Sequence, residues 1–473
     1  MLPRPKNYAI YPAVIPADQP VEMTIVPNER LFLLRENETY DLTVIDVSGD
    51  EPDYYEKLSC HTHLSAVAHG GVLCFSYTFS GEQEHTIRLM QGGVLLGEVS
   101  VYSLYEDMYG LLALKGDLHS HSHRSDGRRD PAALAGHFRE QGYDFFALTD
   151  HNRYYTGGEI DEVYEGVKLG ITRIRGEEVH APGSVIHIVH VGGAYSVAER
   201  YVNDRESYER EIVEYRAKVP EHIPERFVDR YAKTMWATDK IHEAGGLAIF
   251  PHPYWKPSNS MVYNVCDELS ELLLTSGMFD AYELSGAMKQ PGINRSVALW
   301  ADLRAEKGLK IPVVGSSDVH RLEESGSFPH SYTICFAADN SHDAIIDAVK
   351  AGRTVVIEDT GDEYDRQYRC YGSLRSVAYA HFLLNHFFLE RQRICQGEGV
   401  AMRNYGMGIV EKELIELQVK QSDDFRDRFF GRKAPVLPDQ TMLAFENKWR
   451  ERQLRGPLTK GSRIDSDKIT RQI

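Results

Sequence analysis

The sequence lacks the features of a disulfide-bonded or membrane-spanning protein. Six cysteines among 473 residues are scattered without Cys-x-x-Cys spacing, a pattern that predicts reduced and mostly buried thiols. No apolar run has the length that spans a bilayer, and no apolar segment follows the start of the sequence, so we expect no membrane partner and no secretory signal. These absences together predict a cytoplasmic protein.

Net positive charge and several familiar motifs are also missing. Lys and Arg number 53 against 70 Asp and Glu, and the net charge of −17 disfavours a long nucleic acid as partner. The sequence contains no Gly-x-Gly-x-x-Gly or Walker-type loop, so we predict no nucleotide cofactor. It contains no Gly-x-Ser-x-Gly and no Cys-His arrangement that would indicate a covalent nucleophile.

Residues 1–110 are predicted to form an all-β, immunoglobulin-like sandwich. Short runs of Val, Thr, Tyr and Leu lie between turn residues such as Gly70-Gly71. A His-x-His at His61 and His63 is interpreted as a polar strand face, because no complementary ligand motif accompanies it. The expected strands are Val21–Val26, Leu31–Leu34, Tyr40–Val47, Val72–Phe79, Thr86–Met90 and Val94–Leu104.

Residues 111–358 are predicted to form an α/β domain with a parallel sheet, because strand-like and helix-like segments alternate. The expected strands are Leu112–His119, Phe145–Thr149, Ile171–Val179, Val185–Val191, Leu247–Phe250, Ala281–Leu284, Ile311–Gly315 and Tyr332–Ala337. The expected helices are Pro131–Gln141, Arg205–Val219, Glu225–Glu243, Asp267–Thr275, Ile293–Glu306 and Ser341–Lys350.

Residues 359–473 are predicted to be a helical extension. Ser373–Cys395 has the apolar spacing of an amphipathic helix, and Glu411–Phe430 is a second helix. From residue 431 onward, ten Lys and Arg stand against five Asp and Glu, a net charge of +5. We interpret this part as a solvated helix that packs on the α/β domain or on another subunit, which would make a homo-oligomer. A phosphate-backbone contact is the alternative.

One His-x-His motif in the α/β part stands out. His119 and His121 follow the apolar run Tyr109–Leu114, and because alternate residues of a strand face one way, the two imidazoles share a face. Asp126 lies in a Ser-Asp-Gly turn that can fold back toward them. Two imidazoles and a carboxylate at a strand end predict a divalent-metal site.

The same residue types recur at the ends of the other predicted strands. In α/β barrels the chemistry gathers at the carboxyl ends of the strands, and unrelated histidines would not be expected to fall there so often. The joint pattern therefore strengthens the prediction of a metal site. The strand-end groups are Asp150-His151, Glu177-Glu178, His187, His252, Glu283 and Asp318-Val319-His320, with Glu283 expected to face the cavity.

These motifs resemble the PHP (polymerase and histidinol phosphatase) superfamily. The matching segments are Asp117-Leu118-His119-Ser120-His121, Thr149-Asp150-His151, Phe250-Pro251-His252-Pro253 and Ser317-Asp318-Val319-His320. The resemblance covers roughly residues 113–358 and implies a distorted (βα)7 barrel with up to three divalent ions, Mn, Fe or Zn. The ligands that it implies are His119, His121, Asp126, His151, Glu178, His187, His252, Asp318 and His320.

Several neighbouring residues receive other roles. The resemblance favours Glu178 over Glu177 as the bridging ligand. His190 lies three positions after His187, and side chains an odd number of positions apart on a strand point to opposite faces, so His190 is expected to face away from the site. His123 and His180 are interpreted as non-ligands. Asp117 and Asp150 could orient an imidazole from behind.

The predicted ligand set suits phosphoester chemistry. Its three carboxylates would leave about three positive charges on three divalent ions, which favours a phosphoryl group. Two ions can bridge a hydroxide and clamp the attacking and leaving oxygens, with Glu178 between them. Asp318 is the candidate to orient or deprotonate the attacking water, and Arg153 and Arg321 are candidates to pair with the phosphate.

The sequence therefore predicts a metal-dependent phosphoesterase acting on a small phosphorylated substrate, a nucleotide or a metabolite phosphate. Three alternatives stay open. A PHP-type exonuclease would use the same site on a nucleic acid. An amidohydrolase-like enzyme would use the cluster on a carbon–nitrogen or carbon–oxygen bond. A binding module would rely on the sandwich and carry a silent barrel.

Overall fold

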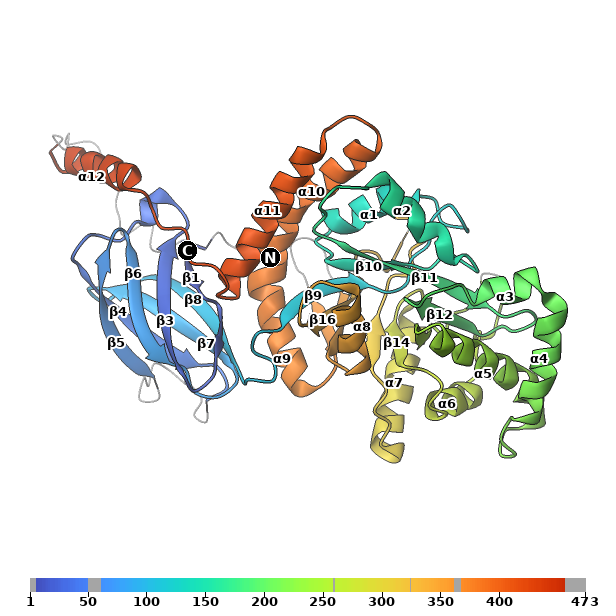
Figure 1. Ribbon diagram of the computed structural model, residues 1–473. Coiled ribbons are helices and arrows are strands. Elements are labelled where there is room, and N and C mark those ends of the chain that lie inside the picture. Colours follow the sequence, from blue (N-terminus) through green and yellow to red (C-terminus); the bar gives the residue numbers. More distant parts are fainter. Residues whose placement is uncertain (1–5, 50–60, 258–259, 324, 361–366, 456–473) are drawn as a thin grey trace. The chain divides into compact units, whose positions relative to one another are not determined.

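The structure, a computed structural model, describes residues 6–49, 61–257, 260–323, 325–360 and 367–455. The chain divides into two compact units (Figure 1). Leu104–Phe430 form one, called here the α/β unit, and Pro3–Ser103 with Gly431–Ile473 form the other, called the β unit. Cys60 and the basic end of the chain, residues 456–473, lie outside the described residues.

The β unit contains an eight-stranded sheet in the order β1-β3-β6-β5-β4-β7-β8-β2. Pairings from β1 along to β8 are antiparallel. The predicted strand at Leu31–Leu34 is wrong, because residues Arg30–Phe32 form a 3-10 helix. Strands β1 and β2 have no predicted counterpart, whereas β5 agrees with the polar strand face expected at His63. The strands are β1 Tyr8–Tyr11, β2 Val14–Pro16, β3 Pro20–Pro27, β4 Thr39–Asp46, β5 Thr62–His69, β6 Val72–Thr78, β7 Glu84–Gln91 and β8 Val94–Leu104.

Alternating apolar side chains form the interior of the β unit. Ile87 and Leu89 on β7 pack in one cluster with Ile25 on β3 and Leu42 on β4. The buried His85 adds a polar link, because its Nδ1 lies 2.7 Å from Asp46 Oδ1 and its Nε2 lies 2.8 Å from Ser103 Oγ. This trio connects the ends of β4, β7 and β8.

The helix α12, Gln440–Arg455, belongs to the β unit. Arg450 Nη2 donates to the carbonyl of Leu33 at 2.9 Å, and Arg30 pairs with Glu446 at 3.3 Å. Residues 431–455 therefore belong to the same unit as residues 6–49 and 61–103, and not to the predicted C-terminal extension.

The α/β unit contains a ten-stranded sheet in the order β15-β14-β13-β12-β11-β10-β9-β16-β17-β18. β9, β10 and β11 run parallel, as do β13, β14 and β15. The strands are β9 Leu112–Asp117, β10 Phe145–Leu148, β11 Thr172–His180, β12 His187–Val191, β13 Leu247–Phe250, β14 Ala281–Ser285, β15 Val313–Gly315, β16 Ser331–Ala337, β17 Thr354–Asp359 and β18 Tyr368–Tyr371.

The predicted all-parallel arrangement is wrong at two places. β12 runs antiparallel to β11 and β13, because only residues 181–186 connect it to β11, and a short connection without a crossover helix reverses the chain. β16 pairs antiparallel with β9 and β17. The sheet also curls: the hydroxyl of Thr333 donates to the carbonyl of Gly315, and that of Thr354 donates to the carbonyl of Val313.

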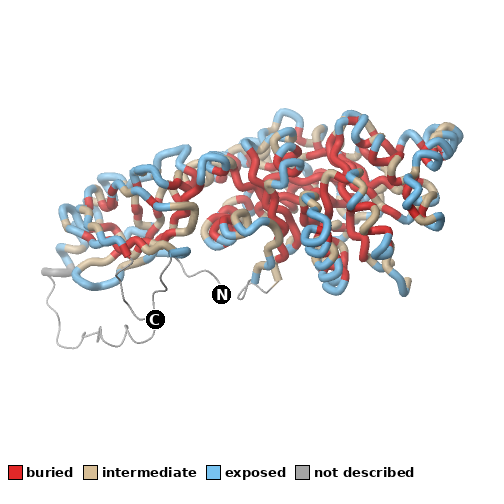
Figure 2. The backbone as a smooth tube through the Cα atoms, turned by 90° about the horizontal axis from the view of Figure 1, so that it is seen from below, coloured by how far each residue is buried: buried red, intermediate tan, exposed pale blue. Residues whose placement is uncertain are grey.

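Helices accompany the curled sheet, and most follow the predicted ranges. α1 begins at Pro131 after the N-cap Asp130, whose carboxylate accepts from the amide of Ala133 at 2.9 Å. The helices are α1 Pro131–Glu140, α2 Gly158–Val163, α3 Ala198–Asn203, α4 Arg205–Ala217, α5 Val228–Glu243, α6 Asp267–Thr275, α7 Gln290–Lys307 and α8 His342–Lys350. Figure 2 shows buried residues through the interior of this unit and exposed ones at its periphery.

The predicted helices after residue 373 pack inside the α/β unit. α9 (Leu374–Leu383) continues through the π-helix Leu384–Phe388 into α10 (Leu389–Gly406), and α11 (Lys412–Phe429) follows. The buried Arg139 of α1 pairs with Glu398 of α10 at 2.7 Å, and its Nη2 donates to Ser422 of α11 at 2.9 Å. Buried, mutually bonded charges of this kind fix α1, α10 and α11 against one another.

Cysteine burial differs from the prediction. Cys335 and Cys395 are buried, Cys370 is intermediate, and Cys74 and Cys266 are exposed; all five described thiols are free.

Within the described ranges, no helix is long and apolar enough to cross a membrane.

Candidate metal centre

The end of β9 lies against the loop that follows β15. The amide of Asp318 donates to the carbonyl of His119 at 2.9 Å, and the amide of His121 donates to the carbonyl of Val319 at 3.0 Å. Ser120 and Val319 form an isolated parallel bridge. The His-x-His and the Asp-x-His motifs therefore face one another across two adjacent backbone segments.

Two buried carboxylates hold these segments in place. Asp117 accepts from the amides of His119 and Ser317, both at 3.0 Å, and so connects β9 to the loop after β15. Asp150 accepts from the amide and the hydroxyl of Ser122, each at 2.7 Å. Both residues bond to the backbone or to hydroxyls, so they shape the turns rather than orient an imidazole directly.

Gly127 closes the turn that presents Asp126. A Cβ at this position would lie 2.4 Å from the carbonyl oxygen of His121, so a side chain cannot fit here. The turn places Asp126 Oδ1 3.4 Å from His151 Nε2 and 3.2 Å from His320 Nε2.

All nine predicted ligands meet in four overlapping groups of donor atoms, in each of which the atoms lie within 4.8 Å of one another. The groups are His121, Asp126, His151 and His320; His119, His121, Glu178 and Asp318; His151, Glu178 and His180; and Glu178, His187 and His252. Three of the four groups include Glu178. This arrangement can hold more than one ion with a shared carboxylate.

Glu178 lies at the centre of the imidazoles. Its carboxylate is 2.8 Å from Nδ1 of His151 and 2.8 Å from Nδ1 of His187. It is 3.2 Å from Nε2 of His252 and 3.5 Å from Nε2 of His119. Only 1% of the Glu178 residue surface is exposed, so water cannot replace these contacts.

Glu283 of β14 supports one of the imidazoles from behind. Its Oε2 lies 2.9 Å from Nδ1 of His119, which leaves Nε2 of His119 directed at Glu178 and Asp318. A Cβ on Gly286 would lie 2.5 Å from Glu283 Oε1, so the glycine provides the space for this carboxylate. A carboxylate on the far nitrogen fixes the tautomer and orientation of a metal-binding histidine.

Two of the predicted ligands have unusual backbone conformations. His252, between two prolines at the end of β13, has a φ of 26°, and Asp318 has a φ of 50°. Such left-handed conformations are uncommon for residues with a side chain and cluster at functional sites.

The electrostatics of the site differ from one imidazole to the next: burial lowers the pKa of His187 to about 4 and also lowers the pKa of His121. Burial opposes charge on Glu178, but His187 and His119 hold the pKa of its carboxyl well below the usual range. Burial also opposes charge on His151, but Asp126 and Glu178 raise the pKa of His151 to about 10. Cations would compete with these protons for the same nitrogens.

The buried polar atoms of the site test whether the donor set fits metal ions. Several make no hydrogen bond of acceptable geometry among the described residues, although Nδ1 of His151 and Nδ1 of His187 lie 2.8 Å from the Glu178 carboxylate. A buried polar atom without a partner is rare and calls for an explanation. Imidazole and carboxylate donors suit Mn, Fe or Zn, so the residues fit such ions. The orphaned atoms include Nε2 of His119, both ring nitrogens of His121, Nδ1 of His151, Nε2 of His180, Nδ1 of His187 and Oδ1 of Asp318.

His180 enters the site although the sequence interpretation left it out. It lies two residues beyond Glu178 on β11, so the two side chains share a face, and its Nε2 is 3.5 Å from the Glu178 carboxylate. That spacing is the signal that identifies it. His123 is exposed, and its Nδ1 faces the carbonyl of Arg129 at 3.3 Å.

Glu177 and His190 lie away from the donor groups. Nδ1 of His190 is 3.1 Å from Glu177 Oε1, and both side chains are fully buried. The Glu177 carboxylate also accepts from the hydroxyl of Ser196 and the amide of Val197. These contacts are structural, on the opposite side of β11 from Glu178.

A cavity of about 690 Å³, called here the metal cavity, opens onto the donor groups. Arg321 lines it together with Trp255 and Ser327, whereas the exposed Arg153 is not among its described lining residues. Of the two predicted arginines, Arg321 therefore lines the metal cavity, and the role of either in pairing with a phosphate stays a prediction.

Similar solved structures come from three bacteria. A two-domain protein of Bacteroides vulgatus containing a predicted PHP-like metal-dependent phosphoesterase is 20% identical, with a TM-score of 0.35, over 56% of this chain and 76% of that one. A metal-dependent phosphoesterase of Bifidobacterium adolescentis is 20% identical, with a TM-score of 0.32, over 43% and 87%. An amidohydrolase of Chromobacterium violaceum, with bound sulfate, is 19% identical, with a TM-score of 0.30, over 45% and 89%.

Two of these similar structures are thus described by their names as predicted metal-dependent phosphoesterases, and one of the two as PHP-like. No protein-family model matches the sequence, and no curated protein does. Because the TM-scores are low, what the site can do follows from its own geometry.

Proposed function

We propose that this protein is a metal-dependent phosphoesterase that hydrolyses a small phosphoester. The observation that carries the proposal is the shared position of Glu178 among four buried or half-buried imidazoles with orphaned nitrogens. The proposed metal ligands are the nine predicted residues together with His180, on the distorted barrel that the sequence predicts. These ligands would hold up to three Mn, Fe or Zn ions. Divalent ions bound there would supply Lewis-acid polarisation of the phosphoryl oxygens and a hydroxide at neutral pH.

The chain's own residues position the reactants. Asp318, whose backbone amide donates a hydrogen bond to the carbonyl of His119, orients the attacking water or accepts its proton. Arg321 at the edge of the metal cavity pairs with a non-bridging phosphoryl oxygen. Glu283 keeps His119 in one tautomer throughout the reaction.

The test is phosphate release from a panel of monoesters and diesters, including sugar phosphates, nucleoside monophosphates and short RNA. Turnover with added manganese that disappears on chelation supports the proposal, and the preferred ester defines the substrate class. Turnover of short RNA alone would favour the exonuclease. Activity on neutral amides or esters alone, with none on phosphoesters, would contradict it and favour the amidohydrolase-like alternative.

A further inference from the structure

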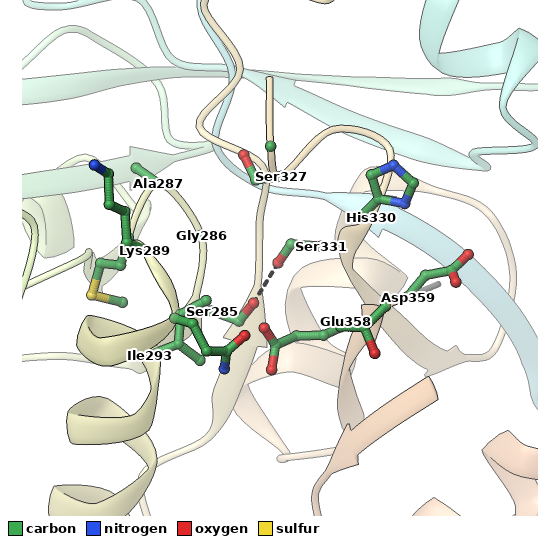
Figure 3. A pocket seen from close by; sticks show the side chains of 14 residues that line it. Ser285, Gly286, Ala287, Lys289, Ile293, Ser327, His330, Ser331, Glu358 and Asp359 are labelled. Carbon is green, nitrogen blue, oxygen red and sulfur yellow. Dashed lines mark hydrogen bonds between the residues drawn. The ribbon is translucent and has the colours of Figure 1, made fainter. Parts of the chain in front are cut away.

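A second cavity of about 620 Å³, called here the side cavity, adjoins the metal cavity (Figure 3). The two share Ala287, Gly326 and Ser327 as lining residues. The end of β14, the start of α7, residues 326–331 and the end of β17 supply the walls of the side cavity. A molecule bound at the metal ligands therefore has room to extend into it.

The floor of the side cavity is polar and buried. Ser285 is 0% exposed, Ser331 4% and Glu358 6%. The two serine hydroxyls lie 2.6 Å apart, so whichever one donates, the other keeps its own proton for a further acceptor. Figure 3 shows the Glu358 side chain reaching toward this pair.

Glu358 is held in position but keeps capacity to accept. The hydroxyl of Tyr371 donates to its Oε2 at 2.7 Å, which fixes the carboxylate. An ionised carboxylate accepts about four hydrogen bonds, so Glu358 can accept from further hydroxyl groups. Lys289 at the rim adds a donor.

The charge of the lining decides what the side cavity accommodates. Glu358 and Asp359 carry two negative charges, against one positive charge on Lys289 and an exposed His330. A second phosphate would meet the buried Glu358 carboxylate at low dielectric and be repelled. An alkyl or aryl group would leave the remaining acceptor sites of the Glu358 carboxylate and the one unused hydroxyl proton of the serine pair unsatisfied, which is costly.

The side cavity lies close to the candidate metal ligands along β14. Ser285 lies two residues beyond Glu283, roughly 7 Å along the strand. Glu283 contacts the predicted ligand His119, whereas Ser285 lines the side cavity. Together with the three lining residues that the cavities share, this proximity allows one molecule to reach both cavities.

We propose that the side cavity binds the alcohol part of the phosphoester and selects a polyhydroxy alcohol, such as a sugar, with a single phosphate. Glu358 accepts hydrogen bonds from its hydroxyl groups, and Ser285 and Ser331 exchange hydrogen bonds with them. This proposal names the substrate class of the metal-dependent phosphoesterase proposed above and rests on it.

The experiment compares three probes on the manganese-loaded full chain: glucose 6-phosphate, hexyl phosphate and fructose 1,6-bisphosphate. We expect kcat/KM for glucose 6-phosphate to exceed that of the other two by about 10-fold or more, because each buried group left unpaired reduces transition-state binding. Glu358→Gln should reduce the ratio of glucose 6-phosphate to hexyl phosphate by about 10-fold, the size expected for a hydrogen bond to a charged group. Ser331→Ala should reduce it several-fold.

Two further measurements make the result specific. Glu306→Gln, on the exposed end of α7, is the matched control and should leave the ratio unchanged. Glucose 6-phosphate should slow amide exchange in residues 286–293 and 326–331 of the unmodified chain, and less so in the Glu358→Gln protein.

The outcomes separate the two proposals. Metal-dependent turnover of hexyl phosphate with no preference for glucose 6-phosphate, and a ratio insensitive to both variants, overturns the side-cavity proposal and leaves the phosphoesterase intact. Absence of metal-dependent turnover of all three probes, with turnover of a nucleoside monophosphate or diester of the wider panel, also overturns only the side-cavity proposal. Absence of metal-dependent turnover across the whole panel overturns the phosphoesterase itself.

Discussion

The adjacent carboxylates of Glu177 and Glu178 serve opposite sides of β11. Glu178 lies among the imidazoles of the metal centre, whereas Glu177 bonds to His190, Ser196 and the amide of Val197. The alternation of a β-strand produces this division, because neighbouring side chains point to opposite faces. One glutamate is therefore available to ions and the other stabilises the fold.

This division predicts different effects for two isosteric substitutions. Glu178→Gln removes the negative charge of a carboxylate that belongs to three of the four donor groups, so we expect it to lower the amount of bound manganese by more than half. Inductively coupled plasma mass spectrometry of gel-filtered protein measures that amount. Glu177→Gln should retain the metal but lower the melting temperature, because it weakens buried hydrogen bonds. Equal metal loss in the two variants would contradict the assignment.

Glu283→Gln tests the support of His119. The substitution removes the charge that orients Nδ1 of His119, and loss of such a partner reduces metal affinity by about 10- to 100-fold. Competition with a chromophoric chelator measures the affinity. An unchanged affinity would show that Glu283 does not support the metal centre.

The packing of α1 against α10 predicts a large effect at Glu398. Glu398→Gln removes the nearer of two buried carboxylates that pair with the fully buried Arg139, the other being Asp144 at 3.5 Å, and we expect it to cost about 3 kcal/mol of unfolding free energy. Glu390→Gln on the same helix alters only an exposed ion pair with Arg393 and should cost less than about 0.5 kcal/mol. Denaturant unfolding of both variants checks the contrast, and similar values would contradict it.

His85 predicts that the β unit loses stability in acid. Burial outweighs the hydrogen bond to Asp46 and lowers the pKa of His85 below its usual value of 6.5. The unfolded chain therefore binds the proton more readily, and this contribution to stability declines as the pH falls below about 6.5.

His85→Gln provides the comparison, because glutamine stays neutral across the range. Calorimetric unfolding at pH 8 and pH 5.5 should show a larger loss of stability in the unmodified chain than in the variant. Equal losses would mean that His85 does not titrate as its burial implies.

Much of the metal centre could be predicted from the sequence, because its residues lie in short motifs at strand ends. His119, His121 and Asp126 lie close together in the sequence, at a strand end and in the turn that follows it. Asp318 and His320 are two positions apart and so share a face. The structure brings these motifs together with His151, His187 and His252. His180 obeys the same parity rule relative to Glu178 and was nevertheless set aside.

The sequence could not show contacts between distant segments. Glu283 meets His119 across 164 positions of the chain, and no local pattern predicts which strand lies behind an imidazole. The return of α12 to the β unit depends on contacts such as Arg450 with Leu33, 417 positions apart. The antiparallel direction of β12 follows from the short connection at residues 181–186, which holds no helix and departs from the strand–helix alternation of the neighbouring segments.

The measurement that tests the central claim most directly is phosphate release and metal content determined on the same samples. Manganese is titrated into chelator-treated protein, with glucose 6-phosphate and hexyl phosphate as substrates. His252→Ala removes one ligand at the Glu178 carboxylate, and His123→Ala, an exposed histidine outside the donor groups, is the control. We predict turnover that rises with bound metal and persists in His123→Ala. In His252→Ala we expect turnover to fall by about 100-fold or more, because a ligand that positions the metal is lost. Metal-loaded protein that releases no phosphate, or equal release from metal-free protein, would contradict the account.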